Sequence, residues 1–166
     1  MIYSFAPIID ESCSVLLLGT MPGAESLRRQ QYYGYEHNVF WRIIYKLFDR
    51  EPDGDYVKRI AFLLQHSIAL WDVLKACERE GSSDSKIKKP VPNDFAGLYL
   101  HYPNIKSVCF NGGGAEKLYS RFVEKRGVVA SGKGFYKFPS TSPAYTIAFE
   151  KKLEQWQSLL PLLTVF

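Results

Sequence analysis

Short apolar runs that alternate with segments of helical character are the feature that most constrains the fold of this chain. The runs expected to form strands are Val15–Leu18, Ser67–Leu74, Ser107–Phe110 and Phe135–Phe138. The segments expected to form helices are Val39–Phe48, Asp53–Gln65, Asp94–Tyr102, Ala115–Lys125 and Thr146–Leu163. Strands that alternate with helices predict an α/β sandwich around a mainly parallel sheet.

The chain reads as a single domain over residues 1–166. This length is enough to bury a sizeable core, and the sequence shows neither an internal repeat nor a boundary between two domains. One stretch, Glu78–Pro92, is polar and interrupted by Gly, Ser and Pro, and it predicts a mobile loop.

The composition limits the partners that the chain can have. Its net charge of +4 permits a polyanionic partner without requiring one. Its aromatic content of 15% exceeds what a core of this size needs, so some rings are expected to stack on a ligand.

The cysteines and histidines give no sign of a metal centre. Cys13, Cys77 and Cys109 lack the CxxC spacing, and an iron–sulfur cluster requires four thiolates. Cys13 and Cys109 border or lie in strand-like runs, so we expect core thiols in a reduced, cytosolic compartment. Met1–Pro7 lacks the features of a signal peptide, and no apolar stretch is long enough for a membrane span, which predicts a soluble protein.

Polar or glycine-rich loops follow three of the expected strands. They are Gly19–Asn38, Asn111–Gly114 and Ser140–Tyr145. Because the carboxyl ends of parallel strands meet at one edge of a sheet, we expect these loops to converge. That edge is where open α/β sheets bind their ligands.

The loop after the first strand holds the most unusual group of side chains. Tyr32, Tyr33, His37 and Asn38 lie just ahead of an amphipathic helix, and folding alone does not require that assortment. Asn38 is well placed as the N-cap of the helix, and capping accounts for it without a further role. The tyrosine pair fits ordinary loop packing, but a ring beside a strand-end pocket is also how proteins stack a planar base.

The two other loops each allow a structural and a functional interpretation. The amide of Asn111 can read the edge of a heterocycle, or it can form a turn before a glycine-rich helix start. The glycines Gly112–Gly114 can expose backbone N–H groups to a phosphate, although the Lys-Ser/Thr of a Walker motif is missing. Ser140, Thr141 and Ser142 supply hydroxyl groups for phosphate oxygens, or they form a capped helix entry.

Taken together, the three loops resemble motifs of the uracil-DNA glycosylase superfamily. The first resembles G-T-x-P-G-x-x-S-L followed by Y-Y-x-H-P-x-N-x-F-W, and it includes Gly19-Thr20-Met21-Pro22-Gly23, Ser26-Leu27, Tyr32-Tyr33 and Asn38-Val39-Phe40-Trp41. The others are Ser140-Thr141-Ser142-Pro143-Ala144, which resembles the S-T-S-P-A loop, and Asn111-Gly112, which resembles the base-facing strand end. The chain is most similar to the hypoxanthine-DNA glycosylase branch, near the mismatch-specific uracil/thymine-DNA glycosylases.

Two positions depart from these patterns. Met21 stands where the mismatch enzymes have an asparagine that positions water, and a thioether cannot do so. This departure moves the water-positioning role to Asn38, as the hypoxanthine branch implies. The H-P-x before the asparagine is Tyr35-Glu36-His37 here, which leaves the base preference open.

The resemblance implies a three-layer α/β sandwich with a central, mainly parallel four-stranded sheet flanked by helices. It implies a monofunctional DNA glycosylase of base-excision repair that flips a deaminated or mispaired base from double-stranded DNA and hydrolyses its N-glycosidic bond, leaving an abasic site. The base is expected to be hypoxanthine, or uracil or thymine opposite guanine. No metal or cofactor is expected, and a monomer is expected to act on DNA in the cytoplasm, associated with the nucleoid.

The resemblance also implies roles for individual residues. Asn38 and His37 are the expected catalytic residues, with Asn38 placing the water and His37 or main-chain donors assisting the departing base. Contacts to the base are expected from Gly19, Thr20, Met21, Tyr33 and Asn111. Contacts to the DNA are expected from Pro22, Gly23, Ser140, Thr141, Ser142, Pro143, Ala144 and Tyr145.

Two other classes of function fit the same residues. A nucleotide-binding α/β enzyme would use Asn111–Gly114 for phosphate and would bind mononucleotides rather than duplex DNA. A mismatch-binding module without chemistry would bind mispaired duplexes and release no base, and its affinity would fall steeply with salt.

Overall fold

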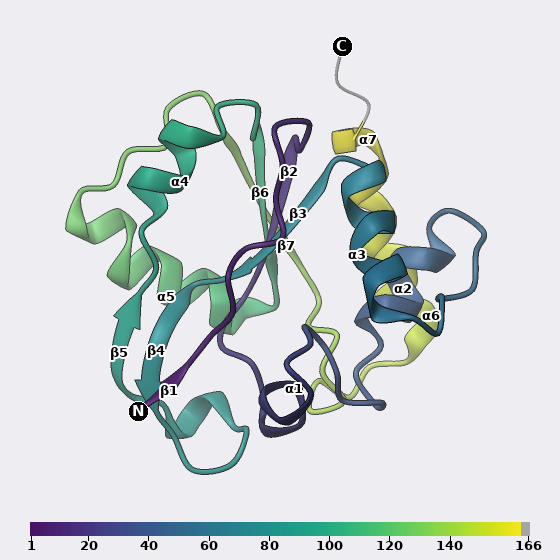
Figure 1. The fold of residues 1–166 in the computed structure, drawn as a ribbon, viewed down its shortest axis with the longest axis horizontal. Coiled ribbons are helices and arrows are strands. Elements are labelled where there is room, and N and C mark those ends of the chain that lie inside the picture. The colour runs from purple at the N-terminus through teal and green to yellow at the C-terminus, as the bar shows by residue number, and fades with distance from the viewer. Residues whose placement is uncertain (164–166) are drawn as a thin grey trace.

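A central sheet of four parallel strands organises the computed structural model, which describes residues 1–163 (Figure 1). The strands are β2 (Val15–Gly19), β3 (Ile68–Asp72), β6 (Ser107–Asn111) and β7 (Gly134–Phe138), in the spatial order β3-β2-β6-β7. Every pair in this sheet is parallel, with Gly19 opposite Asp72 and Asn111 opposite Phe138. The predicted α/β sandwich around a parallel sheet is confirmed, and all four expected strands are present.

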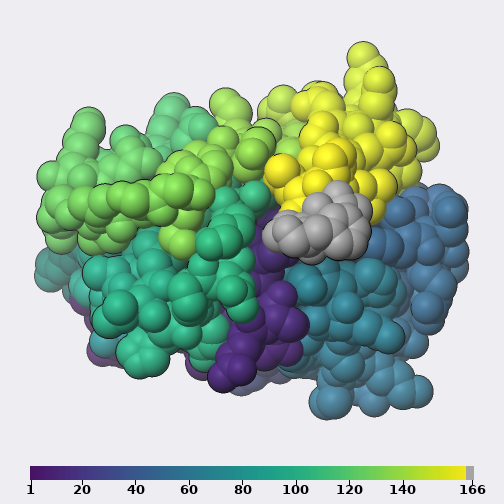
Figure 2. Space-filling view, turned by 90° about the horizontal axis from the view of Figure 1, so that it is seen from above, coloured from purple at the N-terminus to yellow at the C-terminus, as the bar shows by residue number. Residues whose placement is uncertain are grey.

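Helices cover both faces of this sheet, because β2, β3 and β6 are apolar on both faces. On one face, Leu16 and Leu18 pack with α4 (Phe95–His101) and α5 (Gly113–Phe122). On the other face, Val15 and Leu17 pack with α2 (Phe40–Lys46), α3 (Tyr56–Gln65) and α6 (Phe149–Trp156). The view from above shows purple atoms near the start of the chain between the green and teal part of the surface and the blue and yellow part (Figure 2).

The segment Glu78–Pro92 corrects one prediction. The expected strand Ser67–Leu74 ends as β3 at Asp72, and the chain then continues as β4 (Leu74–Glu78) in a second sheet. This sheet is antiparallel and has the order β1-β4-β5, with β1 at Ile2–Tyr3 and β5 at Lys88–Pro92. The expected loop is thus strand in its second half, and it contains a short 3-10 helix, η1 (Asp84–Lys86). Lysines and prolines are common on edge strands and disguise them as loops in a sequence.

Helix ends differ from the expected ones by a few residues. Asp94, expected as the first residue of a helix, is the N-cap of α4, and its side chain accepts the Gly97 N–H (3.0 Å). The expected terminal helix over Thr146–Leu163 is divided into α6, η3 (Gln157–Leu159) and α7 (Leu160–Leu163). Helix α1 (Ala24–Arg29) was not expected, and the last part of the expected helix Ala115–Lys125 is a separate 3-10 helix, η2 (Glu124–Arg126).

The cysteine thiols lie in the core of the protein. Cys13 and Cys109 are fully buried, as predicted, and burial raises their pKa to about 11 and about 12. No helix within residues 1–163 is both long and apolar enough to cross a membrane. A single domain over 1–166 stays a prediction, and residues 164–166 lie outside the described part of the chain.

Candidate active site

The carboxyl end of β2 forms the floor of the candidate site. A Cβ added to Gly19 would lie 2.7 Å from Asp72 Oδ1 and 2.9 Å from Tyr33 Oη, so no larger residue fits there without displacing them. The side chains of Asp72 and Tyr33 therefore meet directly over the last residue of β2. The glycine at this position is required by the close approach of two polar side chains.

Asn111 joins the three loops that follow the strands. Its amide nitrogen donates to Tyr33 Oη (3.0 Å) and to Thr141 Oγ1 (2.9 Å), and its Oδ1 accepts the Thr141 N–H (2.9 Å). The backbone N–H of Val39 also donates to the Thr141 carbonyl (3.1 Å). The predicted convergence of the three loops is confirmed, and both amide hydrogens of Asn111 are used to hold it.

Tyr33 and Asn38 are held by the first turn of α2. Tyr33 has a left-handed backbone (φ 53°), and its ring stacks on Phe40 with 4.0 Å between the ring centroids. Asn38 Oδ1 accepts the Phe40 N–H (3.0 Å), although Val39 rather than Asn38 is the N-cap residue. Within residues 1–163, the Asn38 Nδ2 group has no hydrogen-bond partner. Asn38 thus contributes to the helix start through one atom and leaves the other available.

A cavity of about 400 Å³ opens beside this loop. Tyr33 and Asn38 line it together with Trp41, Arg42 and Tyr56. Asp72 and Asn111 are not in its lining, so Tyr33 and Asn38 are the side chains that belong both to the cavity and to the predicted site. The cavity gives solvent access to Asn38.

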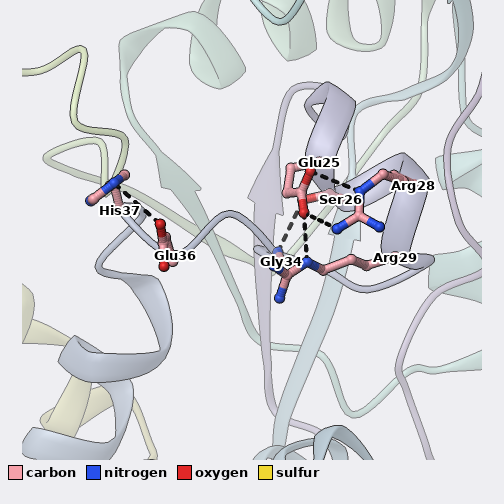
Figure 3. Close-up of polar contacts among 7 residues, drawn as sticks. All are labelled: Glu25, Ser26, Arg28, Arg29, Gly34, Glu36 and His37. Atoms are coloured by element: carbon pink, nitrogen blue, oxygen red, sulfur yellow. Dashed lines mark hydrogen bonds and ion pairs between the residues drawn. The ribbon is translucent and has the colours of Figure 1, made fainter.

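His37 lies at the surface, away from the strand ends. Its side chain is 64% exposed, and its Nε2 lies 3.5 Å from Glu36 Oε1 (Figure 3). On the same connecting loop, Ser26 Oγ accepts the Gly34 N–H (3.0 Å) close to the Glu25 ion pairs. The structure therefore does not bring His37 together with Asn111, Asp72 or the amide of Asn38.

The residues directly after β2 are buried or partly buried. Met21 is 7% exposed and packs in the hydrophobic cluster on the opposite face of the sheet, with α4 and α5. Its side chain is therefore part of the core, and the expected contact of Met21 with the base stays a prediction. Thr20 Oγ1 donates to both carboxylate oxygens of Asp84, at 2.9 and 3.0 Å. Pro22 is buried and Gly23 is partly exposed.

The loop after β7 has an exposed tip and a buried middle part. Pro143, Ala144 and Tyr145 are exposed, whereas Thr141 is 1% exposed and bound to Asn111. The hydroxyl of Thr141 is thus not placed to contact a phosphate, because it lies in the interior. Ser140 and Ser142 accept backbone N–H groups within the loop, at 3.2 Å each, and shape its turns.

Asp72 is the main functional candidate that the sequence did not single out. It is 4% exposed at the end of β3, and no hydrogen bond or ion pair reaches its carboxyl group from the described residues. Burial and the nearby charge of Asp84 raise its pKa to about 7, and Arg79 opposes this shift. Burying a carboxyl group without a hydrogen-bond partner destabilises the folded protein. Groups that are kept in such a state often serve in a functional site, so the position of Asp72 over Gly19 indicates a role in this site. The signal in the sequence was a single carboxylate inside an otherwise apolar strand.

Lys152 is a second residue that the sequence did not reveal. Its side chain is buried, and its Nζ donates to the carbonyl of Ser142 (2.9 Å) and lies 5.6 Å from the ring centroid of Tyr145. Burial lowers the pKa of this ammonium group. Lys152 therefore supports the exposed loop tip from α6.

The site has no arrangement suited to a metal ion. No group of three His, Cys, Asp or Glu side chains that could hold a metal is found among residues 1–163. Its polar atoms are amides, hydroxyls and one buried carboxyl, which suit hydrogen bonding to a heterocycle and to a water molecule.

Comparison with known proteins bears directly on this arrangement. The family model of the Uracil DNA glycosylase superfamily matches residues 6–163. The chain belongs to this superfamily. It is therefore a DNA glycosylase, an enzyme that acts on N-glycosyl bonds and has DNA as its substrate.

Individual relatives agree with this membership. Proteins named hypoxanthine DNA glycosylase from Methanosarcina acetivorans and Methanosarcina barkeri are 44% and 43% identical over 109 residues, which are 65% of this chain and 69% of each relative. The solution NMR structure of a candidate uracil DNA glycosylase from Methanosarcina acetivorans has a TM-score of 0.82 at 35% identity, and the match covers 98% of both chains. The predicted three-layer fold with a four-stranded parallel sheet is thereby confirmed.

Proposed function

We propose that this glycosylase removes hypoxanthine from double-stranded DNA and leaves an abasic site without cutting the strand. The observation that supports it most is the position of Tyr33, which meets Asn111 and Asp72 at the carboxyl edge of the sheet and lines, together with Asn38, the cavity beside them. The names of the relatives from Methanosarcina suggest the base. We further propose that the enzyme acts as a monomer on DNA of the nucleoid.

The first step of this proposal is extrusion of the base. A glycosidic bond inside a duplex is out of reach, and flipping the nucleotide costs a few kcal/mol, least at a mispair. The exposed residues Pro143, Ala144 and Tyr145 are suited to occupy the gap in the base stack. Ser140, Ser142 and the backbone near Gly23 supply donors for the flanking phosphates.

Hydrolysis then requires a water molecule below the sugar carbon. The sugar becomes oxocarbenium-like as the bond breaks, and a positioned water attacks it. Asn38 is suited to orient this water, because its Oδ1 is fixed by the Phe40 N–H and its Nδ2 is free to hydrogen-bond within the cavity. The departing base takes up the bonding electrons and needs a hydrogen-bond donor.

Asp72 is suited to meet the base in its protonated form. With a pKa of about 7, a large share of the carboxyl is neutral at neutral pH and presents one donor and one acceptor. This pair matches the adjacent O6 acceptor and N1–H donor of hypoxanthine. Asn111 retains one lone pair on Oδ1, and its main task is to hold Tyr33, whose ring supports the base. His37 is left with a contact at the rim, to DNA rather than to the base.

We do not assign a lysine as nucleophile. Lys152 is the buried lysine near the loop tip, and its ammonium group is bound to the Ser142 carbonyl. An enzyme that uses water alone releases the base and leaves the strand intact.

Base release from labelled duplexes tests the proposal. Duplexes with hypoxanthine, uracil or thymine opposite each partner are incubated with wild type and Asn38→Ala, and abasic sites are read by alkaline cleavage. We expect release of hypoxanthine that depends on Asn38 and no cleavage before alkali. Release of uracil or thymine opposite guanine in its place would overturn the choice of base, and release that survives Asn38→Ala would overturn the mechanism.

A further inference from the structure

The connection between β4 and β5 folds back onto the loop that follows β2. The sequence predicted a mobile loop here, but its first half contacts three successive parts of the Thr20–Ala24 stretch. The contacts are Arg79 Nη2 to the Pro22 carbonyl (2.6 Å), the Ala24 N–H to Ser82 Oγ (2.9 Å), and Thr20 Oγ1 to both carboxylate oxygens of Asp84 (2.9 and 3.0 Å). This connection therefore forms one wall of the site.

Arg79 is the central side chain of this wall. Its Nε donates to the Gly81 carbonyl (2.9 Å), which bends the connection toward the Pro22 carbonyl bound by Nη2. Its Nη1 is buried and has no hydrogen-bond partner within residues 1–163. No carboxylate in that range lies within ion-pair distance of the guanidinium. The positive charge of Arg79 is thus held in the wall by neutral carbonyl groups.

Burial raises the pKa of two carboxyl groups, those of Asp72 and Asp84, and the positive charge of Arg79 lowers it. The charged groups that influence Asp72 are Asp84 and Arg79, both from the connection, whereas Tyr32 and Tyr33 from the loop after β2 have their own pKa values raised by burial and by Asp72. Asp84 raises the pKa of Asp72, and Arg79 lowers it. Burial raises the pKa of both tyrosines, so they are neutral neighbours. Arg79 is therefore the positive charge that acts on Asp72.

We propose that Arg79 is a positioning residue of the base pocket, which fixes the loop after β2 through the Pro22 carbonyl and, as a buried guanidinium without a carboxylate partner, acts on Asp72 together with the Asp84 carboxylate that binds Thr20. This inference rests on the proposed function, because it acts through the pocket in which Asp72 meets the base. Arg79 itself does not touch the reacting atoms. It determines where the pocket wall lies and how readily the carboxyl group holds its proton.

Two substitutions of opposite sign test the electrostatic part. Arg79→Gln removes the positive charge, and Asp84→Asn removes the negative charge while keeping an oxygen that can accept from Thr20. We expect the titration midpoint of Asp72 to rise in Arg79→Gln and to fall in Asp84→Asn, each by roughly half a pH unit or more. The midpoint is measured by NMR from the Asp72 carboxyl carbon, and the pH limb of base release is expected to move in the same direction.

A third substitution separates position from charge. Arg79→Lys keeps the positive charge but loses the planar fork that joins Pro22 to Gly81. We expect a titration midpoint close to that of wild type and a fall in kcat/KM of about tenfold, because one charge-assisted hydrogen bond is lost. Arg126→Gln is the matched control, since Arg126 is exposed in η2 and lies on the ring of Phe122. It removes the same charge and is expected to leave both readouts unchanged.

The outcomes distinguish this inference from the proposed function. Midpoints that stay unchanged, or that move in the same direction in both charge variants, overturn the role of Arg79, even when wild type releases the base. Full activity of Arg79→Lys and Arg79→Gln overturns the positioning role. Opposite shifts of the Asp72 midpoint support the electrostatic role even when no duplex is cleaved, because the NMR titration does not depend on catalysis.

Discussion

Asp72 and Asn111 occupy corresponding positions on the two sides of β2, but their hydrogen bonding is opposite. Each is the last residue of a strand that pairs with β2, and each is buried, at 4% and 9% exposed. Asn111 donates both amide hydrogens and accepts one N–H, whereas the Asp72 carboxyl has no partner among the described residues. Asn111 thus holds the site together, and Asp72 is the group left available for a substrate.

The contrast also concerns stability. A satisfied buried amide stabilises its surroundings, and removal of one partner leaves the other unsatisfied. A buried carboxyl without a partner destabilises the folded state when it is charged. The two strand ends should therefore respond to substitution in opposite ways, and this difference can be measured.

The largest effect is expected from a substitution that leaves both strand ends intact. Asn38→Ala removes the amide assigned to the water, and we expect the rate of base release to fall by about a thousandfold. Single-turnover kinetics with a hypoxanthine duplex measures this rate. Asn38→Asp keeps an acceptor for the Phe40 N–H but loses the Nδ2 donor, so a similar loss of rate in Asn38→Asp at the melting temperature of wild type would show that the loss is not a defect of α2. A rate within tenfold of wild type in Asn38→Ala would contradict the assignment.

Asp72→Ala is expected to have the next largest effect on activity. It removes the donor to the base but not the water, so we expect base release to fall by about a hundredfold. Asp72→Asn keeps one donor and one acceptor at all pH values and is expected to lose less activity and to flatten the pH profile above pH 7 or so. A pH profile of Asp72→Asn that matches wild type would remove Asp72 from the mechanism.

Asp72→Asn is also expected to stabilise the protein at neutral pH. Burial raises the folded-state pKa of Asp72 from 3.8 to about 7, so the native state holds this proton more tightly than the unfolded state. The stability associated with the proton is present below about pH 4 and is lost as the pH rises toward about 7. We expect Asp72→Asn to gain about 1–3 kcal/mol at neutral pH and little at pH 4 or so, measured by urea unfolding. A loss of stability at neutral pH would contradict the unpaired state of Asp72.

Asn111→Ala is expected to act in the opposite direction. It breaks three hydrogen bonds and leaves the Thr141 N–H unsatisfied in the interior, so we expect a loss of about 2–3 kcal/mol. A double-mutant cycle with Thr141→Val measures how much of this loss belongs to the pair. Strict additivity of the two substitutions would contradict the link between the loops after β6 and β7.

The sequence predicted the convergence of the three loops because its signals are local. Each loop follows an apolar strand directly, and parallel strands bring such ends together whatever the details of packing. The same argument located Asn38 and Tyr33, since both lie in one short stretch between β2 and α2. It could not decide what Asn111 does, because the partners of its amide lie 78 and 30 residues away in the chain.

Other features depend on which face a side chain occupies. Met21 and Thr141 belong to motif stretches, but the structure buries both, and no local pattern distinguishes a buried motif residue from an exposed one. Asp72 was visible only as a carboxylate within an apolar strand, and its lack of partners depends on the folded surroundings. The wall formed by Arg79 and Asp84 depends on the small antiparallel sheet, which edge-strand lysines and prolines concealed.

The smallest effect is expected from a substitution that alters the support of the exposed tip of the loop after β7 and leaves both strand ends unchanged. Lys152→Met keeps the length and apolar part of the side chain but loses the bond to the Ser142 carbonyl. We expect kcat/KM for base release to fall by about threefold to fivefold, because a loosely held tip inserts less readily into the duplex. Lys151→Met removes the same charge from the exposed neighbouring position and is the matched control. An equal effect of both substitutions would assign the loss to charge alone, whereas a larger effect at Lys152 would show that the loop after β7 is positioned from α6, independently of the tie that Asn111 provides.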